Sequence, residues 1–204
     1  MTSSDTMQAL SGEDYLTSPV REDLYVLLSN LLVQPPTGDL MRQLADLSWD
    51  VAVSPALAAS LDTLRAAATA CSQGAVEREF EDLFIGLGRG EMMPYASWYA
   101  EKLLMGAPLV RLRSDLAKLG IRRRAKVCEP EDHVAALCET MALIIRSPQI
   151  SPEQQRDFFF KHMQPWMVRF FIDLQRASAA RFYRAVGGLG EHFLRVERLH
   201  LQPK

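Results

Sequence analysis

Hydrophobic residues recur every three or four positions along most of the chain, which is the spacing that places side chains on one face of an α-helix. The first such segment begins at Val20 and ends before Pro35-Pro36, because proline cannot continue the helical hydrogen-bond ladder. Strict alternation of apolar and polar residues over four to eight positions, which would indicate a strand, hardly occurs. The pattern predicts an all-α protein.

Helix-capping residues and glycines divide the rest of the chain into further segments. Ser54-Pro55 has the form of an N-cap with proline at the first helical position, and residues 151–154 have the sequence of a capping box. Gly74, Gly106 and Gly120 are expected helix ends. The predicted helices run over residues 20–34, 39–47, 55–73, 75–87, 96–106, 108–120, 130–146, 152–163, 166–178 and 179–201, with a candidate break at Gly187-Gly188.

These segments predict a compact bundle of about ten helices in a single domain over residues 19–204. Residues 1–18 are mostly small and polar, and we expect a flexible N-terminal segment there. The glycine-rich stretch GLGRGEMMPY is the clearest internal joint, so a hinge is expected over residues 86–94. Since such a hinge allows two copies to exchange helices, we expect a monomer or a dimer.

Composition and charge exclude several classes of partner. The formal net charge of −2 provides no long-range attraction for nucleic acid or for an anionic membrane. The apolar stretches are interrupted by charge and are too short to span a bilayer, so no membrane insertion is expected. Three cysteines do not make a disulfide framework, and the N-terminus lacks the basic start and apolar run of a secretory signal. We therefore expect a cytoplasmic protein.

The stretch EPEDH, which begins at Glu129, joins a basic run to an apolar helix and permits two interpretations. In the structural one, Pro130 is the first residue of the helix, and the acidic residues stabilise the helix by lying near the positive end of its dipole. In the functional one, Asp132 and His133 form a site. On a helical wheel Asp132 points away from the apolar stripe of the helix, and His133 lies at the edge of that stripe. Both side chains are therefore expected to be accessible.

Other site chemistries have weak support. Cys128, His133 and Cys138 are spaced five residues apart, and on one helix this spacing does not bring side chains together around a metal. The chain has neither the G-x-S-x-G of a hydrolase nor the G-x-G-x-x-G of a dinucleotide loop. We expect no metal and no cofactor.

Two segments concentrate charge or aromatic residues. The segment from Arg111 to Lys126 is strongly basic and fits either a solvated surface or a surface for an anion or an acidic partner. The segment MMPYASWY places two methionines, Tyr95, Trp98 and Tyr99 in and just after a loop. Such residues usually pack in a core, but beside a flexible loop they also suit a groove for an apolar peptide.

Three motifs, taken together, resemble the TorD/DmsD family of redox-enzyme maturation chaperones. They are a proline-aromatic loop with a downstream Ser and Tyr (Pro94-Tyr95, Ser97 and Tyr99), an E-P-x-D-H motif from Glu129 to His133, and an H-x-x-P-W segment from His162 to Trp166. Their order and spacing match the family from about Arg21 to Leu199.

The resemblance implies a cytoplasmic, all-α chaperone and not an enzyme. Such proteins bind the twin-arginine signal peptide of a molybdenum-containing oxidoreductase subunit and delay its export until the cofactor is inserted and the subunit has folded. The peptide-binding residues that the resemblance implies are Tyr95, Tyr99, Asp132 and His133, with Glu129 and Pro130 shaping the turn, Trp98 added for its proximity to the loop, and Arg21 as a further candidate. An exposed Asp132 would supply charge for the arginines, and the aromatic and methionine side chains would supply apolar surface.

Two other functions stay open. One is a nitrate-reductase-type assembly factor, which binds a similar subunit that carries no export signal. The other is an enzyme that uses Asp132 and His133 as acid and base on a nucleotide. The enzyme would need a small, closed pocket around His133 and a perturbed pKa for its imidazole.

Overall fold

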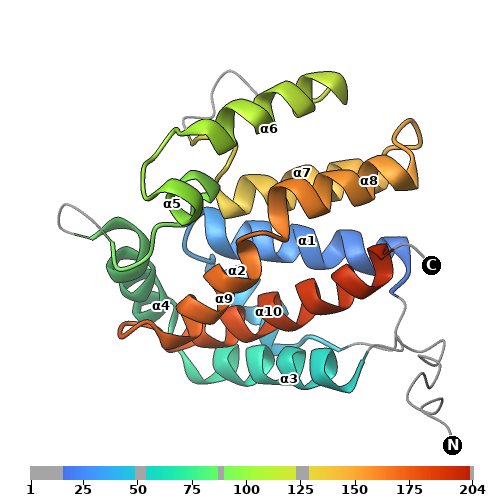
Figure 1. The fold of residues 1–204 in the computed structure, drawn as a ribbon. Coiled ribbons are helices and arrows are strands. Elements are labelled where there is room, and N and C mark those ends of the chain that lie inside the picture. Colours follow the sequence, from blue (N-terminus) through green and yellow to red (C-terminus); the bar gives the residue numbers. More distant parts are fainter. Residues whose placement is uncertain (1–15, 49–53, 87–89, 123–128, 203–204) are drawn as a thin grey trace, which may run out of the picture.

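The computed structural model describes residues 16–48, 54–86, 90–122 and 129–202. Within them the chain forms ten α-helices and no strand, with one isolated bridge between Tyr95 and His133 (Figure 1). The α-helices are α1 (Ser18–Val33), α2 (Gly38–Ala45), α3 (Pro55–Ala70), α4 (Gln73–Phe80), α5 (Ala96–Glu101), α6 (Ala107–Lys118), α7 (Val134–Arg146), α8 (Pro152–Phe158), α9 (Met167–Arg176) and α10 (Phe182–Leu201). Two helices continue as π-helical turns, η2 (Glu81–Ile85) after α4 and η3 (Phe159–Met163) after α8. The prediction of an all-α fold is confirmed.

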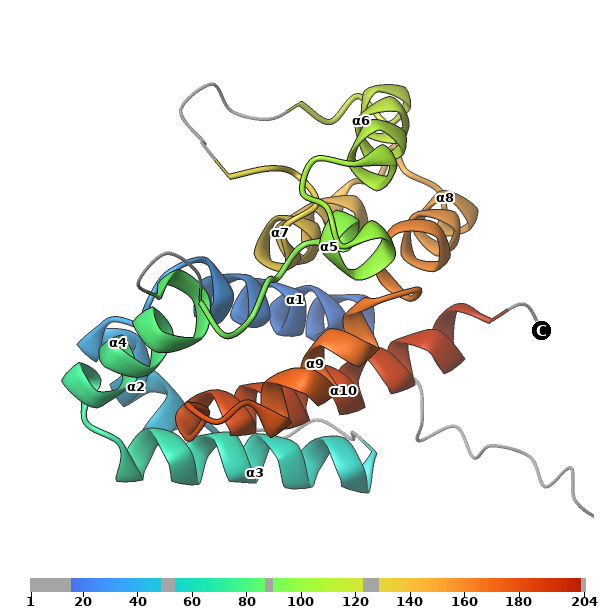
Figure 2. The ribbon, with the colours of Figure 1, turned by 60° about the vertical axis from the view of Figure 1, so that its left-hand side comes forward.

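The helices are stacked in layers. From one side of the molecule to the other, the order is α3, then α9 with α10, then α1, then α5 with α7 and α8, and finally α6 (Figures 1 and 2). The core between the layers is built from apolar stripes such as that of α7, whose Val134, Leu137, Cys138, Met141 and Ile144 are fully buried. Helix α6 is the outermost element, and it packs mainly against α5.

A buried ion pair joins the first helix to the last. The guanidinium of Arg21 donates two hydrogen bonds of 2.7 Å to the two carboxylate oxygens of Glu197, and the hydroxyl of Tyr25 donates a third of 3.2 Å. Arg21 is 2% exposed and Glu197 is 0% exposed. Arg21 is thus a core residue, and its position does not support the expected contact with a peptide.

The last helix is continuous, so the break expected at Gly187-Gly188 is wrong. A Cβ on Gly190 would lie 2.3 Å from the ring of Phe171, and a Cβ on Gly187 would lie 2.9 Å from the Phe171 carbonyl oxygen. These glycines therefore let α9 and α10 approach closely. Packing of this kind outweighs the low helix propensity of glycine.

The start of α10 is set by a carboxylate from α4. The two side-chain oxygens of Glu79 accept hydrogen bonds of 2.8, 3.0 and 2.6 Å from the backbone N–H groups of Arg181, Phe182 and Tyr183. Glu79 thereby satisfies N–H groups that a helix N-terminus leaves without partners. This contact explains why α10 begins at Phe182 and not at Ala179 as expected.

Other helix ends follow local signals unevenly. The N-cap of Ser54 and the capping box of Ser151 with Gln154 are confirmed. Gly74, an expected helix end, lies inside α4 because α3 has already ended at Ala70. The helix expected over residues 96–106 ends early, at Glu101.

Some expectations involve residues outside the described ranges. The expected flexible segment over residues 1–18 is described only from Leu16, which is 3% exposed, and Ser18 already begins α1. The hinge expected over residues 86–94 stays a prediction, because the described ranges leave out residues 87–89. Among the described helices, none has the length and hydropathy needed to cross a membrane.

Candidate functional site

The proline-aromatic loop and the EPEDH turn lie side by side. The backbone N–H of Ala96 donates to the carbonyl of Asp132 at 3.0 Å, and the N–H of Val134 donates to the carbonyl of Pro94 at 2.8 Å. Tyr95 and His133 form the isolated antiparallel bridge between these two bonds. The structure thus brings together two motifs that are more than thirty residues apart in the sequence.

Asp132 is buried, and the expectation of an accessible side chain is wrong. It is 0% exposed, and its Oδ2 accepts a hydrogen bond of 2.9 Å from the backbone N–H of Ser97 at the start of α5. The helical wheel does not apply to this residue, because α7 begins at Val134 and not at Pro130. Residues 130–133 form a turn, which is closed by a hydrogen bond of 3.1 Å from the N–H of His133 to the Pro130 carbonyl.

His133 is the N-cap of α7. Its Nδ1 accepts a hydrogen bond of 3.2 Å from the N–H of Ala135, and its ring packs edge-on against that of Tyr95 with 5.1 Å between the centroids. The side chain is 7% exposed, so the expected accessibility of His133 is wrong as well. Burial lowers the pKa of His133 to about 4, although Glu129 and Asp132 oppose the shift. The imidazole is therefore neutral at physiological pH.

The remaining residues of the motif hold this turn in place. The hydroxyl of Tyr95 donates to the Glu129 carboxylate, and burial together with this bond raises the pKa of Tyr95. Glu131 accepts hydrogen bonds of 3.0 and 2.8 Å from the guanidinium of Arg113, which connects the turn to α6.

Tyr99 extends the site along α5. Its hydroxyl donates to Asp173 on α9 at 3.0 Å, and its ring lies 5.3 Å, centroid to centroid, from that of Trp166. Burial and the neighbouring Asp173 raise the pKa of Tyr99, so it stays protonated. Trp166 is held in turn by a hydrogen bond of 2.9 Å from its Nε1 to the carbonyl of His162.

These residues border a pocket of about 260 Å³ between α5, α6 and the start of α9. Its lining comprises Ala96, Tyr99, Ala100, Pro108, Arg111, Leu112, Asp132, Lys161, His162, Pro165 and Trp166. Within the described part of the chain, the second carboxylate oxygen of Asp132, Oδ1, is buried and has no hydrogen-bond partner. We call this cavity the Asp132 pocket.

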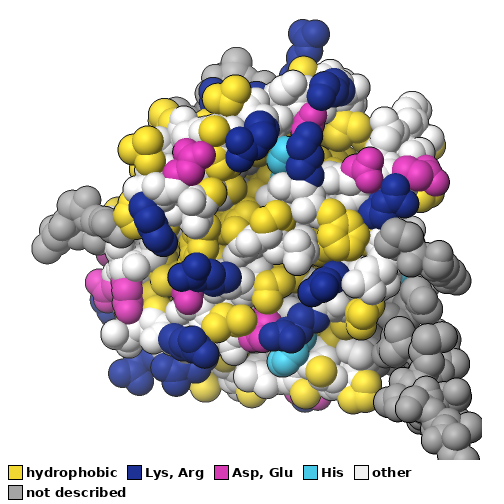
Figure 3. All heavy atoms as spheres, in the orientation of Figure 1, with side chains coloured by type: hydrophobic (Ala, Val, Ile, Leu, Met, Phe, Trp, Pro, Cys, Tyr) yellow, Lys and Arg dark blue, Asp and Glu magenta, His cyan; other side chains and the backbone are white. Residues whose placement is uncertain are grey.

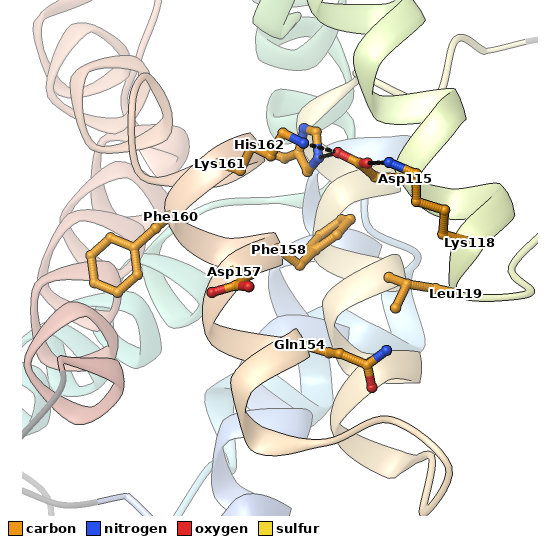
Figure 4. A pocket seen from close by; sticks show the side chains of 9 residues that line it. All are labelled: Asp115, Lys118, Leu119, Gln154, Asp157, Phe158, Phe160, Lys161 and His162. Atoms are coloured by element: carbon orange, nitrogen blue, oxygen red, sulfur yellow. Dashed lines mark hydrogen bonds and ion pairs between the residues drawn. The ribbon is translucent and has the colours of Figure 1, made fainter.

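A second, larger pocket of about 540 Å³ adjoins the first, and Lys161 and His162 line both. At their junction Asp115 of α6 accepts hydrogen bonds from Lys118 at 2.8 Å, from Lys161, and from His162 at 3.0 Å (Figure 4). The three donors hold the pKa of Asp115 well below its usual range, so its carboxylate is ionised. Leu119, Phe158 and Phe160 are the apolar residues that line the larger pocket.

On the face shown in Figure 3, hydrophobic side chains form the floor of a hollow below α6, and Lys and Arg side chains stand around it. The basic run expected as a charged surface is described only in part, because residues 123–126 lie outside the described ranges. In the described residues, no group of three His, Cys, Asp or Glu side chains is arranged to hold a metal ion.

Of the EPEDH residues, Asp132 and His133 were expected to contact the peptide, and the structure places these two differently. Asp132 and Tyr99 line the pocket, whereas His133 is absent from the lining of both pockets. Asp115 and Arg111 were missed as pocket residues, because they lie on a helix face without a motif. His162 and Trp166 belong to the H-x-x-P-W segment, and that motif was the sequence signal that pointed to them.

Comparisons with known proteins agree with the motifs. A family model described as nitrate reductase delta subunit matches residues 50–172. The chain is 27% identical over 198 residues to the chaperone protein TorD of Aliivibrio fischeri, and the match covers 87% of this chain and 92% of that protein. It is 31% identical over 130 residues to the chaperone protein TorD of Vibrio cholerae serotype O1 (strain M66-2), and this match spans 59% of each protein.

The fold is also found in a solved structure. A protein from Archaeoglobus fulgidus that is described as a redox enzyme maturation protein superposes with a TM-score of 0.58 at 19% sequence identity, covering 89% of this chain and 97% of that one. These relatives are named as chaperones or maturation proteins and not as catalysts, which supports the prediction of a non-catalytic maturation chaperone. The chain belongs to the nitrate reductase delta subunit family, and its resemblance to the TorD-type redox-enzyme maturation chaperones is confirmed.

Proposed function

We propose that this chain is a chaperone that binds the twin-arginine signal peptide of a molybdenum-containing oxidoreductase subunit and delays its export until the cofactor is inserted and the subunit has folded. The observation that supports the proposal most is the convergence of three motifs on the Asp132 pocket. Tyr99 comes from the proline-aromatic loop, Asp132 from the EPEDH turn, and Trp166 from the H-x-x-P-W segment.

The unsatisfied oxygen of Asp132 provides the reason for a cationic ligand. A buried polar atom without a partner is costly, and a bound group that donates to it removes that cost. Asp132 is one of the residues that line the pocket, so a ligand bound there lies next to its carboxylate. A guanidinium fits this requirement, since it can donate to the carboxylate while stacking on the aromatic walls of Tyr99 and Trp166.

The segment beyond the arginines needs an apolar surface. Four large apolar side chains are exposed next to the Asp132 pocket. Three of them lie in the connection between α5 and α6: Leu103 (63% exposed), Leu104 (42%) and Met105 (69%). The fourth, Val110 (65%), lies on α6. An exposed cluster of large apolar side chains is unusual on a folded protein and suits a partner's apolar segment. In this proposal Tyr95, Glu129, Pro130 and His133 position the pocket and do not touch the peptide.

Export is delayed for as long as the signal peptide occupies the pocket. An arginine pair held in a pocket is not free to meet a second receptor, so release sets the time of export. The chaperone needs no chemical step for this. The pKa of His133 is perturbed, as an acid–base enzyme would require, but its imidazole is buried and lines neither pocket, which speaks against that alternative.

The test is calorimetric titration with a synthetic twin-arginine leader. Asp132→Asn keeps an oxygen that can accept from the Ser97 N–H but loses the charge, so we expect the leader to bind about tenfold more weakly or worse. Asp62→Asn, which removes an exposed carboxylate of α3, is the matched control and should leave the affinity unchanged. Wild-type affinity in a folded Asp132→Asn protein would show that the arginines bind elsewhere.

The nitrate-reductase-type assembly factor is the second candidate, because the matching family model carries that description. It predicts a partner subunit without a twin-arginine leader. Isolation of the complexed subunit from the host, followed by identification of its N-terminus by mass spectrometry, separates the two. A leaderless partner supports the assembly factor, and a leader-bearing precursor supports the export chaperone.

A further inference from the structure

The ammonium group of Lys102 lies over two aromatic rings of its own helix end. Its Nζ is 5.4 Å from the centroid of the Trp98 ring and 5.5 Å from that of the Tyr99 ring. Both distances are within the range of cation–π attraction. The pair of rings, which we call the Trp98–Tyr99 face, therefore already holds a cation in this structure.

The backbone at Lys102 is specialised for this placement. Lys102 is the C-cap of α5, with φ 56° and ψ 22°, and its N–H donates to the carbonyl of Trp98 at 2.9 Å. Glycine is the common residue in such a left-handed position, because a side chain there strains the backbone. Here the position carries a long cationic side chain that turns back over Trp98 and Tyr99.

The Trp98–Tyr99 face is continuous with the Asp132 pocket, because Tyr99 belongs to both. A carboxylate also stands close to it, since Asp173 accepts the hydrogen bond from the Tyr99 hydroxyl. Two rings and a nearby carboxylate form an environment that favours a cation over an anion or a neutral group.

We propose that the Trp98–Tyr99 face is a second cation subsite, that Lys102 occupies it in the free chain, and that one arginine of a bound leader displaces Lys102. The identity of the incoming cation rests on the proposed function. Adjacent residues of an extended peptide point to opposite sides. One arginine can therefore enter the Asp132 pocket while its neighbour reaches the Trp98–Tyr99 face.

Lys102 acts in this arrangement as an internal competitor. A guanidinium stacks on aromatic rings better than an ammonium does, so a paired arginine can displace it. A leader in which that position holds an uncharged residue leaves Lys102 in place. The competition therefore contributes to selectivity for two successive arginines over one.

The test compares Lys102→Met with Arg65→Met. Methionine keeps an unbranched apolar stem and removes the charge, and Arg65 is an exposed cation of α3, in the layer farthest from α6. Because an exposed cation–π contact is weak, we expect Lys102→Met to bind the twin-arginine leader about two- to fivefold more tightly. Arg65→Met should bind it as the wild type does, and a leader with Gln-Gln in place of Arg-Arg should show no gain with either variant.

Unchanged or weaker leader binding by Lys102→Met would overturn the proposal, as would an equal gain in Arg65→Met. A second measurement separates the subsite from the choice of leader. N-acetyl-argininamide is titrated while the indole N–H signal of Trp98, assigned with Trp98→Phe, is followed by NMR. The subsite predicts a saturable shift at a lower concentration in Lys102→Met than in wild type. Absence of a shift in both proteins overturns the subsite even if the leader binds, whereas a shift without leader binding overturns only the proposed function.

Discussion

The carboxylate of Asp132 accepts a hydrogen bond of 2.9 Å from the backbone N–H of Ser97, a residue 35 positions earlier in the chain. Together with the two backbone bonds around Tyr95 and His133, it fastens the start of α5 to the turn before α7. One oxygen of Asp132 therefore serves the fold, and the other is left for the pocket.

This division of roles predicts different effects for two substitutions of Asp132. Asp132→Ala leaves the buried N–H of Ser97 without its acceptor, so we expect a loss of about 1 to 3 kcal/mol in the free energy of unfolding. Asp132→Asn keeps an acceptor and should lose about 1 kcal/mol or less. Urea denaturation of both variants measures the difference. Equal stability of the two would mean that the bond contributes nothing to the fold.

The buried imidazole of His133 predicts a stability that depends on pH. Burial lowers its pKa from 6.5 to about 4 in the folded chain, so between these values the unfolded chain binds more protons. The contribution of His133 to the free energy of unfolding is therefore fully present above pH 6.5 and is lost as the pH falls towards 4. The loss is on the order of 3 kcal/mol. Urea denaturation at a series of pH values measures the slope.

His133→Asn is the matched control for that slope. Asparagine is a good N-cap, so the start of α7 keeps an acceptor, but it does not titrate. The variant should show a flatter dependence on pH between 6.5 and 4. A slope as steep as that of the wild type would assign the effect to another group, such as His162, whose pKa burial also lowers.

The Arg21–Glu197 pair predicts a large effect on stability with little effect on the pocket. Arg21→Met leaves the carboxylate of Glu197 buried without its partner, and we expect a loss of about 3 to 5 kcal/mol in the free energy of unfolding. The double variant Arg21→Met with Glu197→Leu removes the uncompensated charge and should recover most of that loss. Thermal and urea unfolding of the wild type and the two variants measure these changes, and a double variant no more stable than Arg21→Met would contradict the explanation.

Two neighbouring glycines of α10 should respond in opposite directions. A methyl group on Gly190 would collide with the Phe171 ring, so Gly190→Ala should lose about 1 to 3 kcal/mol in the free energy of unfolding. Gly188 has only the Gln175 side-chain oxygen near its Cβ position, at 3.9 Å, and Gly188→Ala should gain about 0.5 to 1 kcal/mol from better helix propensity. Circular-dichroism melting measures both. A stabilised Gly190→Ala would show that α9 and α10 can move apart at low cost.

Much of the fold was predictable because it rests on short-range signals. The caps at Ser54 and Ser151 act on backbone groups within the next few residues, and the apolar stripe of α7 follows from helical spacing alone. The break expected at Gly187-Gly188 failed for the opposite reason. Glycine is unfavourable in an isolated helix, but the contact with Phe171 that requires it comes from another helix.

The candidate site shows the same difference between what local sequence signals determine and what contacts between distant residues determine. The sequence by itself determined the all-α class, the N-caps at Ser54 and Ser151 and the family, because periodicity, capping and motif spacing are properties of the chain as written. Only the tertiary structure decided that Asp132 is buried, that His133 caps α7, and that Lys102 lies over Trp98 and Tyr99. The physical reason is that the backbone of residues 94–97 pairs with the turn before α7, and a pairing across so many residues is absent from any local pattern.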